Sequence, residues 1–349
     1  MVSRTYQATG TAGHAALVDE ISSWLALDAD DVDHKHAARR DHALTAVRAL
    51  NEDAAAGDTE AFHLQQLLLS RIYTTVVQLP KGTSAEGSAL LHEVTRLLEN
   101  ATVALEDGCI TPSTLEQAPT EPRPYLSWLK GLVRRHRAFK HPYYTEFIRD
   151  QAGHDDLRTY VVQESLVDGR FDDLLAMMQV GTAGAAKMEI ANNYWDEMGN
   201  GDPDQVHTHL FNKIYEVFDV REDDMESVMT AGDLLTGNLA VLVCRYRRLY
   251  AEAVGFLGMT EWLVPDRFTD VVHAWERLGL PPVGITYHRL HITVDSQHAA
   301  GWFHHVVLPA AHDARMRRGI ARGALWRVNS SARLLDERLG AARGAVATA

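Results

Sequence analysis

The chain has 349 residues, of which 46% are hydrophobic and 23% charged, a composition typical of a folded globular protein that buries a core. Its 24 Gly and 11 Pro residues are few, and runs of β-branched residues are sparse, so helices are favoured and an all-β fold is nearly excluded. The formal net charge of −13 disfavours a nucleic acid or an anionic membrane surface as partner because of long-range repulsion. We therefore expect a small-molecule substrate.

The sequence contains two cysteines, Cys109 and Cys244, which form neither a disulfide framework nor, by themselves, a thiolate metal site. No run approaches the roughly 18 apolar residues of a membrane helix. Asp19 and Glu20 precede any apolar stretch, unlike in a signal peptide. We expect a cytoplasmic protein with no signal peptide and no membrane span.

Helical periodicity in the first third predicts one helix or two over residues 15–51, and further helices over 61–77 and 87–105. Residues 109–124 contain four prolines and few apolar side chains, which is typical of a linker. We therefore predict an N-terminal helical extension over residues 1–120 and a second helical domain over 125–340.

The second domain is predicted to be a compact helical bundle, because helical periodicity recurs between strong stop signals at 199–203 and 279–284. The predicted helices are 125–137, 143–151, 155–167, 171–178, 185–198, 205–218, 231–255, 260–278 and 286–308. The tail over 315–338 carries seven arginines. For this tail we favour a solvated helix face over an anion-binding face.

One predicted helix carries a stripe of potential metal ligands. At about 100° per residue, His291, Asp295 and His298 share one narrow face and spread over about 10 Å along the axis. One metal would hardly take all three side chains, whereas two metals about 3.5–4 Å apart would, with Asp295 in the middle. The alternative is a polar stripe without metal, but three buried titratable groups lacking partners are costly. His288, one turn earlier, is a possible substitute ligand.

A second stretch contains Glu197 and His207, which would lie about 15 Å apart in a continuous helix. The Gly-Asn-Gly-Asp-Pro sequence at 199–203 interrupts that helix, and a kink there would turn both side chains toward one cavity. Other chemistries lack their motifs: there is no nucleophile elbow, Walker loop or dinucleotide fingerprint. A ferritin-type bundle needs two Glu-x-x-His pairs, and only Glu60 and His63 form one.

With these motifs, the chain resembles the heme-oxygenase-like di-iron oxidases over roughly residues 128–311. The likeness rests on His-Pro-Tyr-Tyr at 141–144 leading to Gln163 and Glu164, on Asp-Glu-Met-Gly-Asn-Gly followed by His207, and on the His-x3-Asp-x2-His motif. The resemblance implies an all-α, heme-oxygenase-like helical bundle. It also implies a set of metal ligands: Glu197, His207, Glu261, His291, Asp295 and His298.

The family adds carboxylates that the motifs alone do not identify. Some members use a further glutamate from an earlier helix, for which Glu164 is the candidate and Glu189 the rival. Two ferrous ions carry four positive charges, whereas Glu197, Glu261 and Asp295 supply three negative charges. An ionised Glu164 would therefore bring the buried site to neutrality. Glu261 has an alternative role as a helix N-terminal charge after Thr260, although we favour the ligand.

The resemblance implies two Fe(II) ions as cofactors, O2 as co-substrate and an external electron donor, since no flavin, nicotinamide or iron–sulfur motif is present. We expect N-oxygenation of a small amino acid or amine in specialised metabolism. The alternatives are C–H desaturation or C–C cleavage on the same site, or a metal-free helical binding or structural protein.

Tyr194 and Tyr287 are our candidate catalytic, pocket-lining residues. Arg245, Arg247 and Arg248 could hold a substrate carboxylate, although surface positions are favoured for them. The N-terminal 120 residues lie outside the likeness and would cover the bundle or form a dimer interface, and we expect a homodimer.

Overall fold

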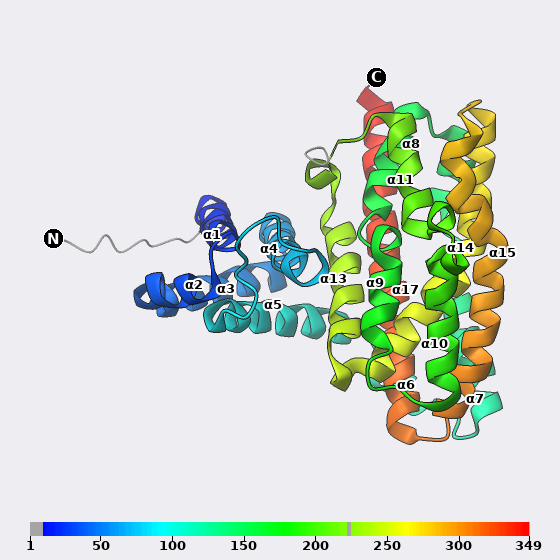
Figure 1. The fold of residues 1–349 in the computed structure, drawn as a ribbon, viewed down its shortest axis with the longest axis horizontal. Helices are drawn as coiled ribbons and strands as arrows, with labels where there is room; N and C mark the ends of the chain where they lie inside the picture. Colours follow the sequence, from blue (N-terminus) through cyan, green and yellow to red (C-terminus); the bar gives the residue numbers. More distant parts are fainter. Residues whose placement is uncertain (1–9, 222–224, 349) are drawn as a thin grey trace. The chain divides into compact units, whose positions relative to one another are not determined.

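The computed structural model describes residues 10–221 and 225–348, which form helices joined by turns, and no strand occurs in these two ranges (Figure 1). The predicted all-α class is therefore confirmed. Contacts divide the chain into two compact units, Met1–Leu105 and Glu106–Ala349. None of the helices described is both long and apolar enough to cross a membrane.

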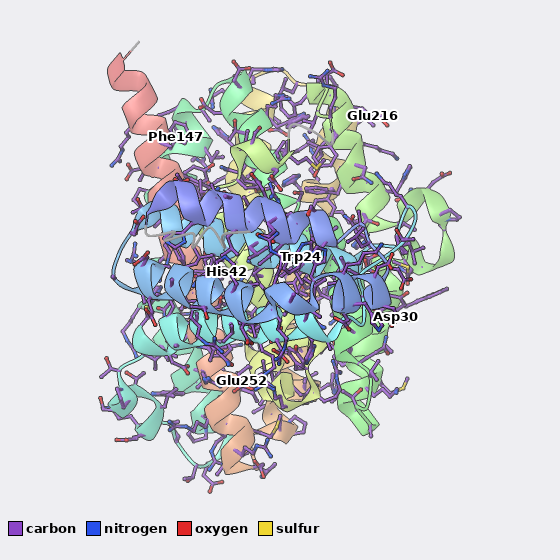
Figure 2. The ribbon with its side chains drawn as sticks, turned by 90° about the vertical axis from the view of Figure 1, so that its left-hand side faces the viewer. Trp24, Asp30, His42, Phe147, Glu216 and Glu252 are labelled. Atoms are coloured by element: carbon purple, nitrogen blue, oxygen red, sulfur yellow. The ribbon has the colours of Figure 1, made fainter. Side chains whose placement is uncertain are left out.

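The first unit is built from α1 (Thr11–Trp24), α2 (Ala29–Lys35), α3 (Arg40–Ala55), α4 (Thr59–Val77) and most of α5 (Ala89–Gly108). Helices α1, α3 and α4 pack against one another. Trp24, at the end of α1 (labelled in Figure 2), is buried. Its ring stacks on His36, with the ring centroids 4.6 Å apart. Asp58 begins α4 by accepting hydrogen bonds from the N–H groups of Glu60 and Ala61.

The segment 109–124, which we predicted as a linker, contains α6 (Pro112–Glu116) and the start of α7 (Pro122–Arg134). Pro112 and Pro122 occupy helix starts, where a missing N–H costs nothing. Pro112 and Pro122 therefore begin helices, whereas Pro119 lies in the short irregular connection between α6 and α7. The predicted domain boundary at 120–125 stays a prediction.

The second unit is a bundle around the 28-residue helix α14 (Tyr250–Arg277). Helix α14 packs along α15 (Thr286–Trp302) and α17 (Ala314–Thr348), and also contacts α13 (Ala231–Arg245) and the π-helix η2 (Tyr143–Gln151) (Figure 1). Further α- and π-helices of this unit are α8 (His154–Glu164), α9 (Phe171–Met178), α10 (Gly184–Glu197), α11 (His207–Phe218), the π-helix η9 (Phe303–Val307) and α16 (Leu308–Ala310).

The helix break that we predicted between 255 and 260 is wrong. Helix α13 ends at Arg245, Tyr246 is extended (φ −107°, ψ 119°), and α14 runs without interruption from Tyr250 through Glu261. Gly255 lies inside α14, at a point where the backbone of α17 passes close to it. A Cβ at this position would lie 2.0 Å from the carbonyl oxygen of Ile320 on α17. The glycine therefore allows tight packing between two helices instead of ending one.

The arginine-rich tail is also different from the solvated face that we favoured. It forms α17, whose Trp326 and Leu335 are fully buried in the unit. Two of its arginines, Arg327 and Arg338, are buried as well. Arg338 donates to Glu164 at 2.7 Å and forms an ion pair with Asp233 at 2.7 Å, so it is held between two carboxylates in the interior.

Candidate metal centre

Six buried side chains form two groups of potential metal ligands in the second unit. Glu197, His207 and His291 make up the first group, and Glu261, Asp295 and His298 make up the second. Within each group the donor atoms lie within 4.8 Å of one another. The six residues come from the four helices α10, α11, α14 and α15, and α15 contributes to both groups.

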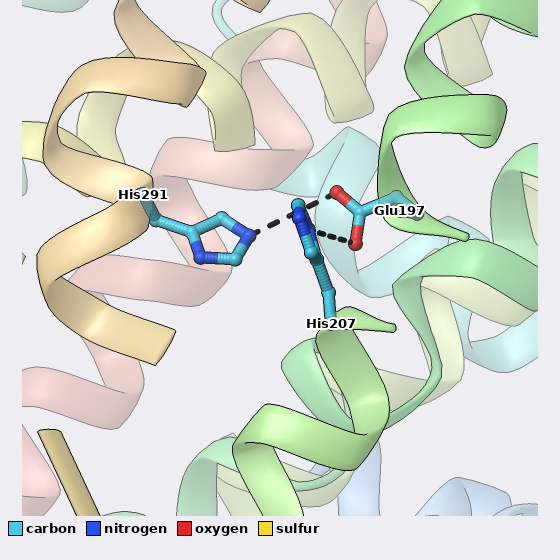
Figure 3. Close-up of side chains that lie close together, drawn as sticks. All are labelled: Glu197, His207 and His291. Carbon is cyan, nitrogen blue, oxygen red and sulfur yellow. Dashed lines mark ion pairs between the residues drawn. The ribbon is translucent and has the colours of Figure 1, made fainter. Parts of the chain in front are cut away.

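In the first group, the carboxylate of Glu197 faces the imidazoles of His207 and His291, whose ring centroids are 4.5 Å apart (Figure 3). Its Oε2 is 2.8 Å from Nδ1 of His207, without the direction of a hydrogen bond, and its Oε1 is 3.8 Å from Nε2 of His291. Burial raises the pKa of Glu197, but the two histidines outweigh burial and lower this pKa to about 2. Glu197 is thus a carboxylate that faces two nitrogen donors.

The glycine-rich break explains how α10 and α11 bring these side chains together. Gly199, Asn200 and Gly201 have φ values of 62°, 54° and 90°, which reverse the chain between Glu197 at the end of α10 and His207 at the start of α11. A Cβ at Gly199 would lie 2.6 Å from the carbonyl carbon of Gln205, so a larger residue would push the two segments apart.

In the second group, Nδ1 of His298 lies 3.5 Å from Oε2 of Glu261 and 4.0 Å from Oδ1 of Asp295. Burial raises the pKa of Asp295, and the charges of Glu261 and Glu197 raise it further. Burial lowers the pKa of His298, but Glu261 and Asp196 outweigh it and raise that pKa to about 9. The carboxylates of Glu197, Glu261 and Asp295 repel one another because they are buried away from water. A bound cation would offset this repulsion.

Two histidines are oriented by hydrogen bonds from their outer ring nitrogens. His291 donates from Nδ1 to the backbone carbonyl of Tyr287 at 2.8 Å, and His298 donates from Nε2 to Oδ2 of Asp196 at 2.9 Å. Each bond leaves the other nitrogen free to face its group, as in metal-binding histidines generally. Sequence reasoning missed Asp196, although it directly precedes Glu197, because neighbouring residues on a helix point about 100° apart.

The donor atoms fit a metal ion. Within the described ranges, four buried donor atoms have no hydrogen-bond partner: Nδ1 of His207, Oε1 of Glu261, Oδ1 of Asp295 and Nδ1 of His298. Buried polar atoms without partners are costly, and a coordinated cation would satisfy them. A set of imidazoles and carboxylates without sulfur suits iron or manganese.

Glu164 and Glu189, the candidates for a further carboxylate ligand, belong to neither group. Glu164 is paired with Arg338, and although burial raises its pKa, Arg338 outweighs burial and lowers it. Glu189 lies on α10 against the backbone of Gly301 on α15. The role of Glu164 as a ligand stays a prediction.

Three other titratable side chains belong to neither group: Asp168 and Asp172, which sequence reasoning missed, and His288, the possible substitute ligand; Asp168 and His288 are buried and Asp172 is half-buried. Oδ2 of Asp168 and Oδ1 of Asp172 lack hydrogen-bond partners in the described structure, and burial followed by nearby carboxylates raises the pKa of both residues. The only sequence signal was three aspartates within residues 168–173. His288 is fully buried, packs 4.4 Å from the ring of Phe268, and has its pKa lowered by burial to about 3.

The two candidate catalytic tyrosines are placed differently. The ring of Tyr287 is buried, lies 4.0 Å from the ring of His291 and contacts Phe211 at 5.1 Å, so it forms part of the aromatic wall beside the first group. Tyr194 lies on α10, one turn before Glu197, and is half-buried. Their catalytic roles stay predictions.

Comparison with known proteins agrees with this geometry. A family model described as iron-containing redox enzyme matches residues 158–332, which is half of the chain and includes all six grouped residues. No match to the chain was found among curated proteins. The chain therefore belongs to the iron-containing redox enzyme family and is an iron oxidoreductase with an all-α, heme-oxygenase-like fold.

Proposed function

We propose that the two groups hold a pair of Fe(II) ions and that the enzyme uses O2 to oxygenate the nitrogen of a small amino acid or amine. Glu197, His207 and His291 would hold one ion, and the second group would hold the other. The observation that carries the proposal is the presence of two adjacent buried triads of nitrogen and oxygen donors, both including residues of α15.

When bound, a ferrous pair supplies electrons to O2. The overall reaction, R-NH2 + O2 + 2 e⁻ + 2 H⁺ → R-NHOH + H2O, needs two electrons per turnover from an external reductant. The chain's own contribution is to position the ligands and exclude water. Asp196 and the carbonyl of Tyr287 fix the imidazole orientations, and the aromatic rings of Phe211, Phe268 and Tyr287 close one side of the first group.

Iron analysis of anaerobically reconstituted protein tests the metal centre. We expect two irons per chain in the wild type, and one in each of the variants His207→Ala and His298→Ala, because each loses a ligand from one group only. His305→Ala removes an exposed histidine outside both groups and is the matched control, which should keep two irons. Less than one iron per wild-type chain would contradict the proposal.

A single turnover with a panel of amino acids and amines, followed by mass spectrometry, tests the reaction. N-oxygenation adds one oxygen atom, which should carry the label when 18O2 is used. Loss of two hydrogens or of carbon dioxide, with no oxygen gained, would instead assign desaturation or C–C cleavage to the same centre. O2 consumption without any change in an organic substrate would assign iron storage.

A further inference from the structure

A cavity of about 580 Å³ lies in the second unit, away from the metal centre, and none of the six grouped residues lines it. Its wall comes from the end of α5, from α6, and from the first turns of α14 and α17. Four arginines and two carboxylates line it: Arg248, Arg315, Arg318, Arg322, Asp107 and Glu252. The lining therefore has two more positive than negative groups, in a chain whose net charge is −13.

The two carboxylates are both used by one arginine. Arg322 donates from Nε and Nη2 to Asp107 at 2.8 and 2.7 Å, and from Nη1 to Glu252 at 2.8 Å. Arg315 and Arg318 have no carboxylate partner in the described part of the chain, and Arg248 is placed only over the ring of Tyr246, at 4.8 Å. Three exposed guanidinium groups at the cavity therefore have no carboxylate partner among the described residues.

Local folding does not explain this arrangement. Arg315, Arg318 and Arg322 lie three and then four residues apart, so they share one face of α17 and repel one another. Arg315 also stands in the first turn of the helix, where positive charge opposes the helix dipole. The helix start itself is already capped, because Oδ1 of Asp313 accepts from the N–H of Met316 at 2.8 Å. A bound anion would turn this repulsion into attraction.

The cavity also offers an apolar surface. Leu115 and Leu249 line it, and both are more than nine-tenths buried, so they present fixed apolar walls beside the arginines. The volume lies within the range of roughly 300–1,000 Å³ that is typical of small-molecule sites. A ligand that fills the cavity therefore combines an anionic group with an apolar body.

We propose that this cavity binds a phosphorylated small molecule whose phosphate contacts Arg248, Arg315 and Arg318 and whose apolar body lies against Leu115 and Leu249. A phosphate monoester carries nearly two negative charges and accepts paired hydrogen bonds from guanidinium groups. It thus matches the unpaired charge of the cavity better than a single carboxylate does. The site is separate from the metal centre and would bind its ligand whether or not iron is present.

Calorimetric titration of the metal-free full-length chain tests this site, since removal of iron prevents phosphate from binding to the metal. The probes are phenyl phosphate, inorganic phosphate and benzoate. We expect saturable binding of phenyl phosphate, weaker binding of inorganic phosphate, which lacks the ring, and weaker binding of benzoate, which carries one charge. The absence of saturable phenyl phosphate binding, or equal affinity for all three probes, would overturn the proposal.

Variants localise the binding. The double variant Arg315→Gln, Arg318→Gln should weaken phenyl phosphate binding by at least about tenfold, because both charge-assisted contacts are lost. Arg123→Gln is the matched control, since Arg123 is also an exposed arginine in the first turn of a helix, α7, but does not line the cavity. Circular dichroism checks that each variant is folded. Unchanged affinity in the folded double variant would refute the site.

Discussion

Glu106 carries a carboxyl that its surroundings scarcely stabilise. The side chain, near the end of α5, is fully buried, and neither carboxyl oxygen has a hydrogen-bond partner within the described ranges. Arg333 on α17 forms an ion pair with it, with Nη2 3.6 Å from Oε1. Burial raises the pKa of Glu106 from its ordinary 4.5 to about 7, opposed by Arg333 and reinforced by Asp107.

This shift makes stability depend on pH. Below pH 4.5, Glu106 is protonated in the folded and unfolded states, so it adds no pH dependence. As the pH rises toward 7, the unfolded state loses the proton while the folded state keeps it, so the free energy of unfolding falls. A raised acid pKa thus stabilises the fold at low pH relative to high pH. This pKa shift corresponds to a free energy of unfolding that is about 3 kcal/mol smaller above pH 7 than below pH 4.5.

The variant Glu106→Gln keeps the shape of the side chain and removes its titration. We expect this variant to be more stable than the wild type by up to about 3 kcal/mol near pH 8.5, with most of this gain absent near pH 5. Denaturant unfolding followed by tryptophan fluorescence and circular dichroism measures the difference. Glu116→Gln, which changes an exposed glutamate of α6, is the control and should show no such dependence. A stability difference equal at both pH values would refute the reasoning.

Three further substitutions test the site and its framework. Asp196→Asn replaces the carboxylate that orients His298 by a neutral amide. Iron affinity at the second group should therefore fall roughly 10- to 100-fold while the first group keeps its iron, and titration with ferrous iron measures both. Gly255→Ala places a Cβ 2.0 Å from a carbonyl oxygen of α17 and should cost about 1–3 kcal/mol or more in thermal unfolding, whereas Gly340→Ala, with nothing within 4 Å, should not destabilise. Arg338→Met leaves two buried carboxylates unpaired and should cost about 3–5 kcal/mol, and an unchanged melting temperature would show that the pairs contribute nothing.

Much of the helical arrangement followed from local signals in the sequence. The stripe of His291, Asp295 and His298 could be read from helical periodicity, because the three residues lie within two turns of one helix. The return of the chain between Glu197 and His207 could be read from glycine and asparagine, which adopt positive φ values readily. Both are short-range features, in which the chemistry of a few neighbouring residues decides the geometry.

The features that the sequence did not predict depend on contacts between distant residues. Glu164 and Arg338 are 174 positions apart, so nothing near either residue signals that they pair. Gly255 resembles a helix breaker until its contact with α17 is known. The start of α14 was consequently misplaced, and the alternative role of Glu261 as a helix N-terminal charge is wrong, because Glu261 is well inside α14. Tertiary packing overrides local propensity at these positions.

Pro265 lies inside α14, four residues after Glu261. Proline has no N–H, so it cannot donate the usual helical hydrogen bond to the carbonyl of the residue four positions earlier, which here is Glu261. Glu261, one of the six grouped residues, therefore lies in a turn of α14 that lacks one backbone hydrogen bond. The backbone carbonyl of Glu261 lacks its usual helical donor, so the turn of α14 that presents this carboxylate to the centre is held by one backbone hydrogen bond fewer than an unbroken helical turn.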